Sequence, residues 1–295
     1  MTVPTTYQAE LISFMAVDNN HLPDISRILE ISARFDTDEM KLAFAMANST
    51  DVQTWLHANR GILFLNGSGD TTAARESPIS ASLASLVFRI PESSQTIVLH
   101  FFCGLHSEFN QTACGPTGLI RSLIAQLCLE YDFNLTFVSS QAYRDGIRDH
   151  DVQTLCETFS AMVSQLPPDC DLYCIIDGIS WLEDPRWRDD LLATFAYICY
   201  LCVDAYCQAR FKLLVSGPVR SLLLTRELRP YGELVNLVEV HSIRLTERDM
   251  PTERAYGVDS PMNTSLPQAG TRYSSRKLIL CLDSSVHNTF SSALG

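Results

Sequence analysis

The sequence predicts an α/β fold in which a parallel five-stranded sheet is covered by helices on both faces. Short apolar runs that are typical of buried strands alternate with longer segments whose apolar residues recur at every third or fourth position. Strands that are separated by helices in this way form parallel sheets, because a parallel connection needs a long crossover. The length of 295 residues and the hydrophobic content of 46% are sufficient for one large domain with a buried core.

Three helix starts are marked by residues that cap helices. Ser49 or Thr50 can cap a short helix, Ser77 precedes a proline at the first helical position, and Asp151 precedes an amphipathic segment. The other elements follow from apolar periodicity and from glycine or proline breaks. The predicted strands are 62–67, 96–102, 172–177, 211–216 and 234–243, and the predicted helices are 25–35, 38–47, 51–59, 78–88, 118–131, 152–166, 189–207 and 219–228.

The chain divides into three parts by composition. A helical lead-in spans residues 1–60, and the α/β domain spans residues 61–250. Residues 251–295 are rich in Ser, Thr and Pro and contain one short apolar run, KLILCL, so they are predicted to form a flexible or poorly ordered tail. In an open parallel sheet, ligands bind at the carboxyl ends of the strands, and we expect any ligand of this domain there.

The composition argues against several classes of partner. The net charge of -12 disfavours nucleic acid and membrane surfaces, because both present phosphates. The first residues, MTVPTTYQAE, do not have the pattern of a signal peptide, and most of the 10 cysteines lie in apolar runs, which is typical of a cytoplasmic protein. The longest apolar stretch, 191–207, contains Asp204 and is predicted to be a core helix rather than a membrane span.

The order of these segments resembles the NACHT-type, nephrocystin-like N-terminal NTPase domain that is common in filamentous fungi. The resemblance covers about residues 25–250, and it implies a signal-transducing P-loop NTPase of the STAND class that binds ATP or GTP with Mg²⁺. Such domains are usually followed by further helical domains and repeats. The segments that carry the resemblance are ILFLNG at 62–67, TIVLHFF at 96–102, GLIRSLIAQL at 118–127, LYCIIDG at 172–178 and FKLLVS at 211–216.

The phosphate-binding loop of such a domain has the pattern G-x-x-x-x-G-K-[ST], in which backbone N–H groups and the lysine hold the phosphates. The corresponding stretch begins at Gly67 and reads GSGDTTAARES. Counted from Gly67, the places of the second glycine, the lysine and the hydroxyl residue hold Thr72, Ala73 and Ala74. The motif therefore lacks the three residues that give it its chemistry.

A shifted register does not restore the motif, because no lysine occurs between Lys41 and Lys212. Asp70 and Glu76 would repel a triphosphate, whereas Arg75 can supply one positive charge, although arginine does not simply replace this lysine. Two interpretations remain open. The stretch is either a divergent nucleotide loop that uses Arg75 or a surface loop that is left from a lost site.

The second motif is the acid that ends the strand LYCIID. The resemblance implies that Asp177 is the Walker B aspartate, which binds the magnesium ion through water, and a structural role at the strand end is the alternative. Family members carry a further pair of acids within about four residues, but here those places hold Ser180 and Trp181. Glu183 and Asp184 follow later and are interpreted as acids at the start of a helix.

The third motif follows the strand FKLLVS. Family members often have a serine–arginine pair here that senses the γ-phosphate; Ser216 matches, whereas the arginine is displaced to Arg220. Neither of two cysteine-containing groups is interpreted as a zinc site. Cys199, Cys202 and Cys207 are predicted to be core thiols, and in the looser group of His100, Cys103, His106 and Cys114, His100 is predicted to pack in the core strand. The predicted vestigial nucleotide site consists of Gly67, Ser68, Gly69, Arg75, Asp177 and Ser216, with Asp177 as the candidate metal ligand.

These observations favour a degenerate domain, a pseudo-NTPase that is retained as a protein-binding or signalling module. On this hypothesis the chain has no cofactor, no assigned catalytic residue and a protein partner that the sequence does not identify. One alternative is a weak NTPase that binds ATP or GTP with Mg²⁺ through Asp177 and Arg75. The other is a truncated gene product without an independent function.

Overall fold

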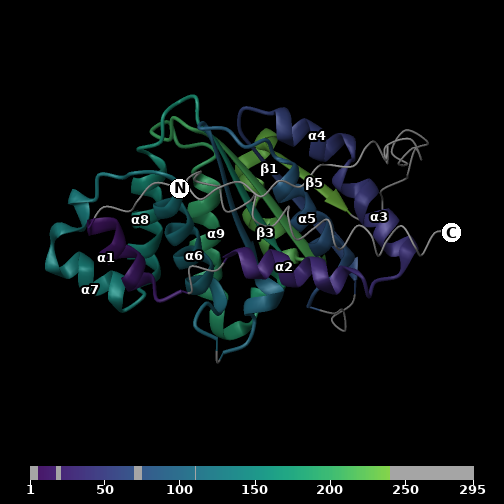
Figure 1. Ribbon diagram of the computed structural model, residues 1–295, viewed down its shortest axis with the longest axis horizontal. Helices are drawn as coiled ribbons and strands as arrows, with labels where there is room; N and C mark the ends of the chain where they lie inside the picture. Colours follow the sequence, from purple (N-terminus) through teal and green to yellow (C-terminus); the bar gives the residue numbers. More distant parts are fainter. Residues whose placement is uncertain (1–5, 18–20, 70–74, 110, 240–295) are drawn as a thin grey trace, which may run out of the picture. The chain divides into compact units, whose positions relative to one another are not determined.

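The computed structural model describes residues 6–17, 21–69, 75–109 and 111–239, which are coloured along the sequence in Figure 1. All of these residues belong to the unit Thr2–Arg244. The predicted tail at 251–295, with its KLILCL run, lies outside the described residues, as does the end of the strand that was predicted at 234–243.

The five described strands form one parallel sheet in the order β2-β3-β4-β1-β5, which confirms the predicted fold class. The chain passes from β1 to the edge strand β2, returns through β3 and β4, and then places β5 on the other side of β1. The strands are β1 (Gly61–Gly69), β2 (Thr96–Phe102), β3 (Asp171–Asp177), β4 (Arg210–Val219) and β5 (Val235–Glu239).

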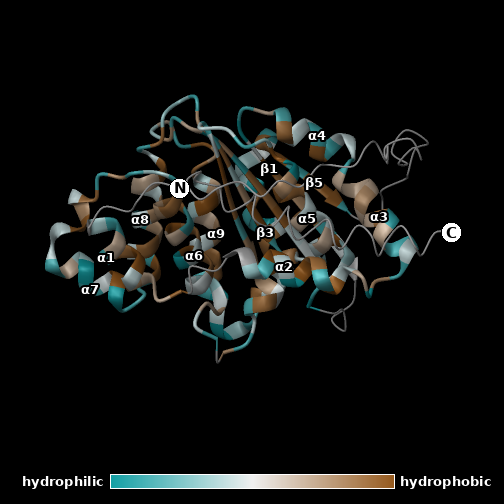
Figure 2. Ribbon diagram, in the orientation of Figure 1, coloured by the Kyte–Doolittle hydropathy of each residue, from teal (hydrophilic) through white to brown (hydrophobic). Residues whose placement is uncertain are grey.

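Helices cover both faces of the sheet, and the alternation of side chains along β1 shows how. Ile62 and Phe64 pack with α1, α6, α8 and α9, whereas Leu63 and Leu65 pack with α2, α4 and α5. Figure 2 shows hydrophobic residues gathered along the strands between these layers. The helices are α1 (Thr6–Met15), α2 (His21–Ser32), α3 (Thr37–Ala47), α4 (Thr50–His57), α5 (Pro78–Arg89), α6 (Gly115–Glu130), α7 (Gln141–Arg148), α8 (Val152–Val163), α9 (Arg188–Tyr200) and α10 (Leu222–Glu227).

The predicted helix caps are confirmed. Ser49, Ser77 and Asp151 each precede a helix, and their side chains accept hydrogen bonds from backbone N–H groups in its first turn. The predicted helix 189–207 ends early, at Tyr200, and the chain then turns; in this turn region the Asp204 side chain accepts the N–H of Tyr206. In the described part of the chain, no helix has the length and apolar character that crossing a membrane requires.

Candidate functional site

The candidate site lies where β1, β3 and β4 end at the carboxyl edge of the sheet. β4 pairs with both β1 and β3, so the ends of these three strands lie side by side. The chain leaves β1 toward one edge of the sheet and leaves β4 toward the other, and this change of direction is where doubly wound folds form their ligand crevice. Three of the predicted site residues, Gly67, Asp177 and Ser216, lie at these strand ends.

The structure brings together two of the predicted site residues, Asp177 and Ser216. The Ser216 hydroxyl donates to Asp177 Oδ1 at 2.5 Å, and the backbone N–H of Gly178 donates to Ser216 Oγ at 3.1 Å. A second hydroxyl, that of Ser80 in α5, lies near enough to the Asp177 side chain to lower its pKa. Gly178 has a positive φ of 69°, and a side chain there would meet the Trp181 ring, so glycine is required directly after the acid.

The environment of Asp177 is apolar and uncharged. Its residue is 2% exposed, and its described side-chain partners are the neutral hydroxyls of Ser216 and Ser80. Burial raises the pKa of the Asp177 carboxyl group, while the hydrogen bonds from Ser216, Ser80 and the Gly178 backbone oppose that shift. Asp177 thus has no cationic partner among the residues that the structure describes.

Ser80 is the site residue that the sequence analysis missed. In a P-loop domain, the hydroxyl residue at the start of the helix and the Walker B aspartate together hold Mg²⁺. Ser80 is the third residue of α5 and contacts Asp177, so it occupies this position in place of Ala74. Counting back from Ser80, the places of the lysine and the second glycine hold Ile79 and Pro78.

Most backbone N–H groups at the start of α5 are already bonded to side chains of the same segment or are absent. Pro78 has no N–H group, the N–H of Ser80 bonds to Ser77 Oγ at 3.1 Å, and the N–H of Ser77 bonds to Ser80 Oγ at 3.2 Å. Among these four residues, only Ile79 has a backbone N–H without a partner in the described structure. A helix start that binds phosphate needs several such groups directed at the ligand.

The first glycines of the predicted phosphate loop do not lie in a loop. Gly67, Ser68 and Gly69 belong to β1, and Gly69 pairs with Val219 of β4. A Cβ atom on Gly67 would lie 2.4 Å from the carbonyl oxygens of Gly217 and Pro218, so the glycine permits the close approach of the two strands. Gly67 therefore has a structural reason to be glycine that involves no ligand.

The arginines near this edge are paired with glutamates. Arg75 Nη1 lies 2.6 Å from Glu108 Oε1, and both side chains are about half exposed. The displaced Arg220 lies 3.6 Å from Glu239 Oε1 and is 62% exposed. No contact in the described structure joins Arg75 to Asp177, so the two residues of the proposed weak NTPase site are not brought together.

The two later acids have different roles from each other. Asp184 caps the short helix η4 (Pro185–Trp187) through the N–H of Arg186, as predicted for an acid at a helix start. Glu183 ends the short helix η3 (Ile179–Leu182) as its C-cap and does not begin a helix, which corrects its interpretation. Its carboxyl group lies near the hydroxyl of Ser221, which precedes α10, and its Oε1 is buried without a hydrogen-bond partner in the described structure. Burial raises the pKa of Glu183, and the Ser221 hydroxyl opposes the shift.

The two cysteine-containing groups are part of the core or are otherwise engaged. Cys199, Cys202 and Cys207 are buried free thiols, and Cys103 is buried beneath the carboxyl edge. In the second group, His106 pairs with Asp24 of α2 at 2.7 Å, His100 is buried in β2, and Cys114 is a partly exposed free thiol. Within the described ranges, no three His, Cys, Asp or Glu side chains are arranged to hold a metal ion.

The fold defines the class of this protein as an α/β domain with an all-parallel five-stranded sheet. The chain belongs to the nephrocystin 3 N-terminal family, whose model matches residues 45–217. No curated protein matches the chain. The matched region contains all of the candidate site residues.

Proposed function

We propose that this chain is a degenerate NACHT-like domain of the STAND class, a pseudo-NTPase that acts by binding a protein partner in a signalling pathway. The observation that carries the proposal is the start of α5. Pro78, Ile79 and Ser80 stand where a P-loop has glycine, lysine and a hydroxyl residue, and the capping box uses the N–H groups that would otherwise face phosphate.

The loss of the lysine alone has a large expected cost. Removing one preorganised electrostatic donor from an active site typically lowers the rate by a factor of about 10² to 10³. Ile79 cannot replace that charge, and it packs against the hydrophobic cluster between α2 and α5. A triphosphate would therefore meet a closed helix start and the surface acids Glu76 and Glu108.

The helical lead-in supports a role in which this edge of the sheet is held rather than opened. Ile25 and Ile28 of α2 are buried in the same cluster as α5. From the same helix, Asp24 pairs with His106 after β2, and Arg27 pairs with Glu76 just before α5 at 3.6 Å. These contacts brace the segment that a nucleotide switch would have to move.

The proposed partner is another protein, and the proposed compartment is the cytoplasm. The net charge of -12 disfavours nucleic acid and anionic membranes, so a protein surface is the partner class that we propose. The eight buried free thiols among the described cysteines agree with a cytoplasmic protein, and the family resemblance suggests a fungal source.

A second candidate function is weak, magnesium-dependent binding of ATP or GTP. The pair of Ser80 and Asp177 favours it, because these are the two protein groups that hold Mg²⁺ in P-loop domains. In this candidate, Arg75 would have to leave Glu108 to reach a phosphate.

Calorimetry on the full chain distinguishes the two functions. We expect no heat of binding and no thermal stabilisation with millimolar ATP or GTP, with or without Mg²⁺. Binding that requires Mg²⁺ and is abolished by Ser80→Ala or Asp177→Ala would contradict the pseudo-NTPase proposal. Ser85→Ala, which removes a hydroxyl from the same helix away from Asp177, is the matched control.

A further inference from the structure

A cavity of about 520 Å³ lies far from the candidate site, between α1 and the segment that follows α6. Its walls come from α1, from residues 132–139, which include the short helix η2 (Thr136–Ser139), and from Arg144 of α7. In Figure 1, α1 and α7 lie next to each other on the side of the molecule away from α3. Cavities of this size are typical of sites for small organic ligands.

The walls of the cavity are fixed by hydrogen bonds to neighbouring helices. On α1, Gln8 Nε2 donates to the Tyr131 carbonyl oxygen at 2.7 Å, and Arg121 of α6 donates to the Met15 carbonyl oxygen at 2.7 Å. On the other wall, the Gln165 side chain accepts the N–H of Asn134 at 2.8 Å and donates to its carbonyl oxygen at 3.2 Å. The cavity is therefore preformed, which reduces the entropy cost of binding.

The inner surface of the cavity is apolar and its rim is charged. Leu11, Phe133, Leu135 and Val138 are buried, and the Phe14 ring lies beside them. An apolar lining of this kind favours a ligand with a compact hydrophobic body.

The rim carries an excess of one negative charge. The carboxylates of Glu10 and Asp132 line the opening, and among the described residues neither carboxylate has a hydrogen bond or an ion pair. Arg144 is the one cationic residue among the described residues of the lining, and its Nε donates to the Val138 carbonyl oxygen at 3.1 Å. Two unpaired carboxylates beside an apolar wall provide a counterion for a cation whose hydrophobic part enters the cavity.

We propose that this cavity binds a small amphipathic amine, a molecule in which a compact apolar or aromatic body carries one ammonium group. The body fills the space between Leu11 and Val138, and the ammonium group lies at the rim near Glu10 and Asp132. The site is separate from the carboxyl edge of the sheet, so it does not depend on whether that edge binds nucleotide.

The test compares two probes of nearly identical shape and opposite charge, tryptamine and indole-3-propionate, by ligand-observed NMR titration against the full chain. We expect tryptamine to bind with a dissociation constant of about 1 mM, which is typical of the affinity of a ligand of this size. Indole-3-propionate should bind at least about fivefold more weakly, because its carboxylate meets Glu10 and Asp132. Equal affinity for both probes, or no binding of tryptamine at concentrations of about 10 mM, would overturn the proposal.

Variants locate the binding at the cavity. Ser139→Trp places a large side chain at an exposed lining position and should lower tryptamine affinity at least about tenfold, whereas the matched Ala142→Trp, exposed on α7 outside the cavity, should have no effect. Glu10→Gln and Asp132→Asn should each weaken tryptamine binding about two- to fivefold and reduce the preference over indole-3-propionate. Binding that survives Ser139→Trp unchanged would show that the amine binds elsewhere and would refute the proposed site.

Discussion

The amino edge of the sheet holds an ionic network, whereas at the carboxyl edge the buried acid Asp177 has no cationic partner among the described residues. At the amino edge, Asp171 is shared by Arg210 and Lys212. At the carboxyl edge, the Ser216 hydroxyl donates to Asp177, and the Ser80 hydroxyl lies nearby. The two acids are the first and last residues of the same strand, β3, so they differ in the charged and polar groups that surround each carboxyl group.

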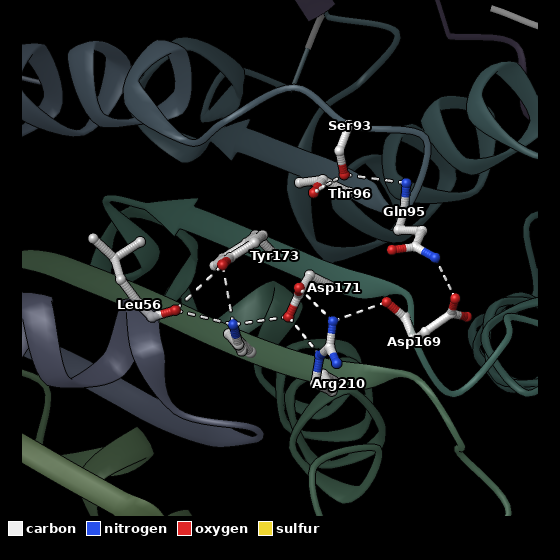
Figure 3. A network of polar contacts seen from close by, with 9 residues as sticks. Leu56, Ser93, Gln95, Thr96, Asp169, Asp171, Tyr173 and Arg210 are labelled. Carbon is white, nitrogen blue, oxygen red and sulfur yellow. Dashed lines mark hydrogen bonds and ion pairs between the residues drawn. The ribbon is translucent and has the colours of Figure 1, made fainter.

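Figure 3 shows the network at the amino edge, in which Arg210 faces Asp171 and Asp169, and Tyr173 faces Leu56. Lys212 Nζ donates to Asp171 Oδ1, to the Tyr173 hydroxyl and to the Leu56 carbonyl oxygen, each at 3.0 Å. The last contact ties the end of α4 to the sheet. The only lysine between residues 42 and 276 therefore serves the fold, at the opposite edge from the place where a P-loop needs one.

The largest effect is expected from Lys212→Met. The lysine is 3% exposed, and its removal leaves Asp171 without one of its two cations, while the Leu56 carbonyl oxygen keeps the Tyr173 hydroxyl as a donor. We expect a loss of about 3 kcal/mol in the free energy of unfolding, because breaking a buried ion pair from one side is strongly destabilising. Urea unfolding followed by circular dichroism measures the change.

Lys41→Met is the control for this prediction. Lys41 pairs with Asp38 on the exposed surface of α3, at a similar distance of 3.1 Å. Its removal should cost less than about 1 kcal/mol. If the two variants lose equal stability, the amino edge network stabilises the fold no more than an exposed ion pair does.

A smaller effect is expected on the free energy of unfolding when the pH is lowered. Acidification should remove stability that Asp171 contributes and should relieve a penalty at Asp177. Burial disfavours ionisation of Asp171, but hydrogen bonds and charges from Arg210 and Lys212 outweigh it and lower the pKa of Asp171. The stability that Asp171 contributes is therefore present above its unfolded pKa of about 3.9 and is lost as the pH falls through the lower folded value. We expect Asp171→Asn to reduce the pH dependence of unfolding below pH of about 4.

If the stability of Asp171→Asn falls at low pH as steeply as that of the wild type, other carboxylates account for acid unfolding. The variant also tests the network at neutral pH, where the loss of the charged acceptor should destabilise the protein. Arg210 and Lys212 would then repel each other without a shared counterion.

Asp177 should behave in the opposite way. Because its folded pKa is raised, ionisation above the unfolded pKa opposes folding, and this penalty grows as the pH rises toward the folded pKa. We therefore expect Asp177→Asn to stabilise the protein at pH of about 7 by on the order of 1 kcal/mol and to have less effect near pH of about 4. Thermal unfolding at the two pH values measures this, and destabilisation at neutral pH would show that the charged acid is needed.

The sequence predicted most of the fold because its signals are local. Buried strands such as 96–102 were found from a continuous apolar run, and Ser77 was found because it precedes a proline and a helical pattern. The helix α7 was missed, because it is short and polar and buries Ile147 as its one fully covered side chain. Its helical state depends on tertiary contacts with α1 and α8 that a local pattern does not report.

The candidate site was predicted less completely because its geometry depends on contacts between distant residues. Asp177 ends β3 and Ser216 lies at the neighbouring level of the paired strand β4, so their proximity followed from the parallel sheet. The place of Ser80 depends on where α5 begins relative to β3, and counting along the loop from Gly67 could not find it. Glu183 was misinterpreted for a similar reason, since its contact with Ser221 is not local in sequence.

The smallest effect is expected from Arg75→Ala, and it separates the two functions most directly. Arg75 and Glu108 form an exposed pair, with side chains 45% and 51% exposed, so its loss should change the free energy of unfolding by less than about 0.5 kcal/mol. Partner binding should be equally unaffected if the carboxyl edge is a closed remnant of a nucleotide site. A variant that unfolds like the wild type but loses a magnesium-dependent response to ATP would instead mean that Arg75 leaves Glu108 to bind phosphate. In that case the carboxyl edge would be a working nucleotide site and not the remnant of one.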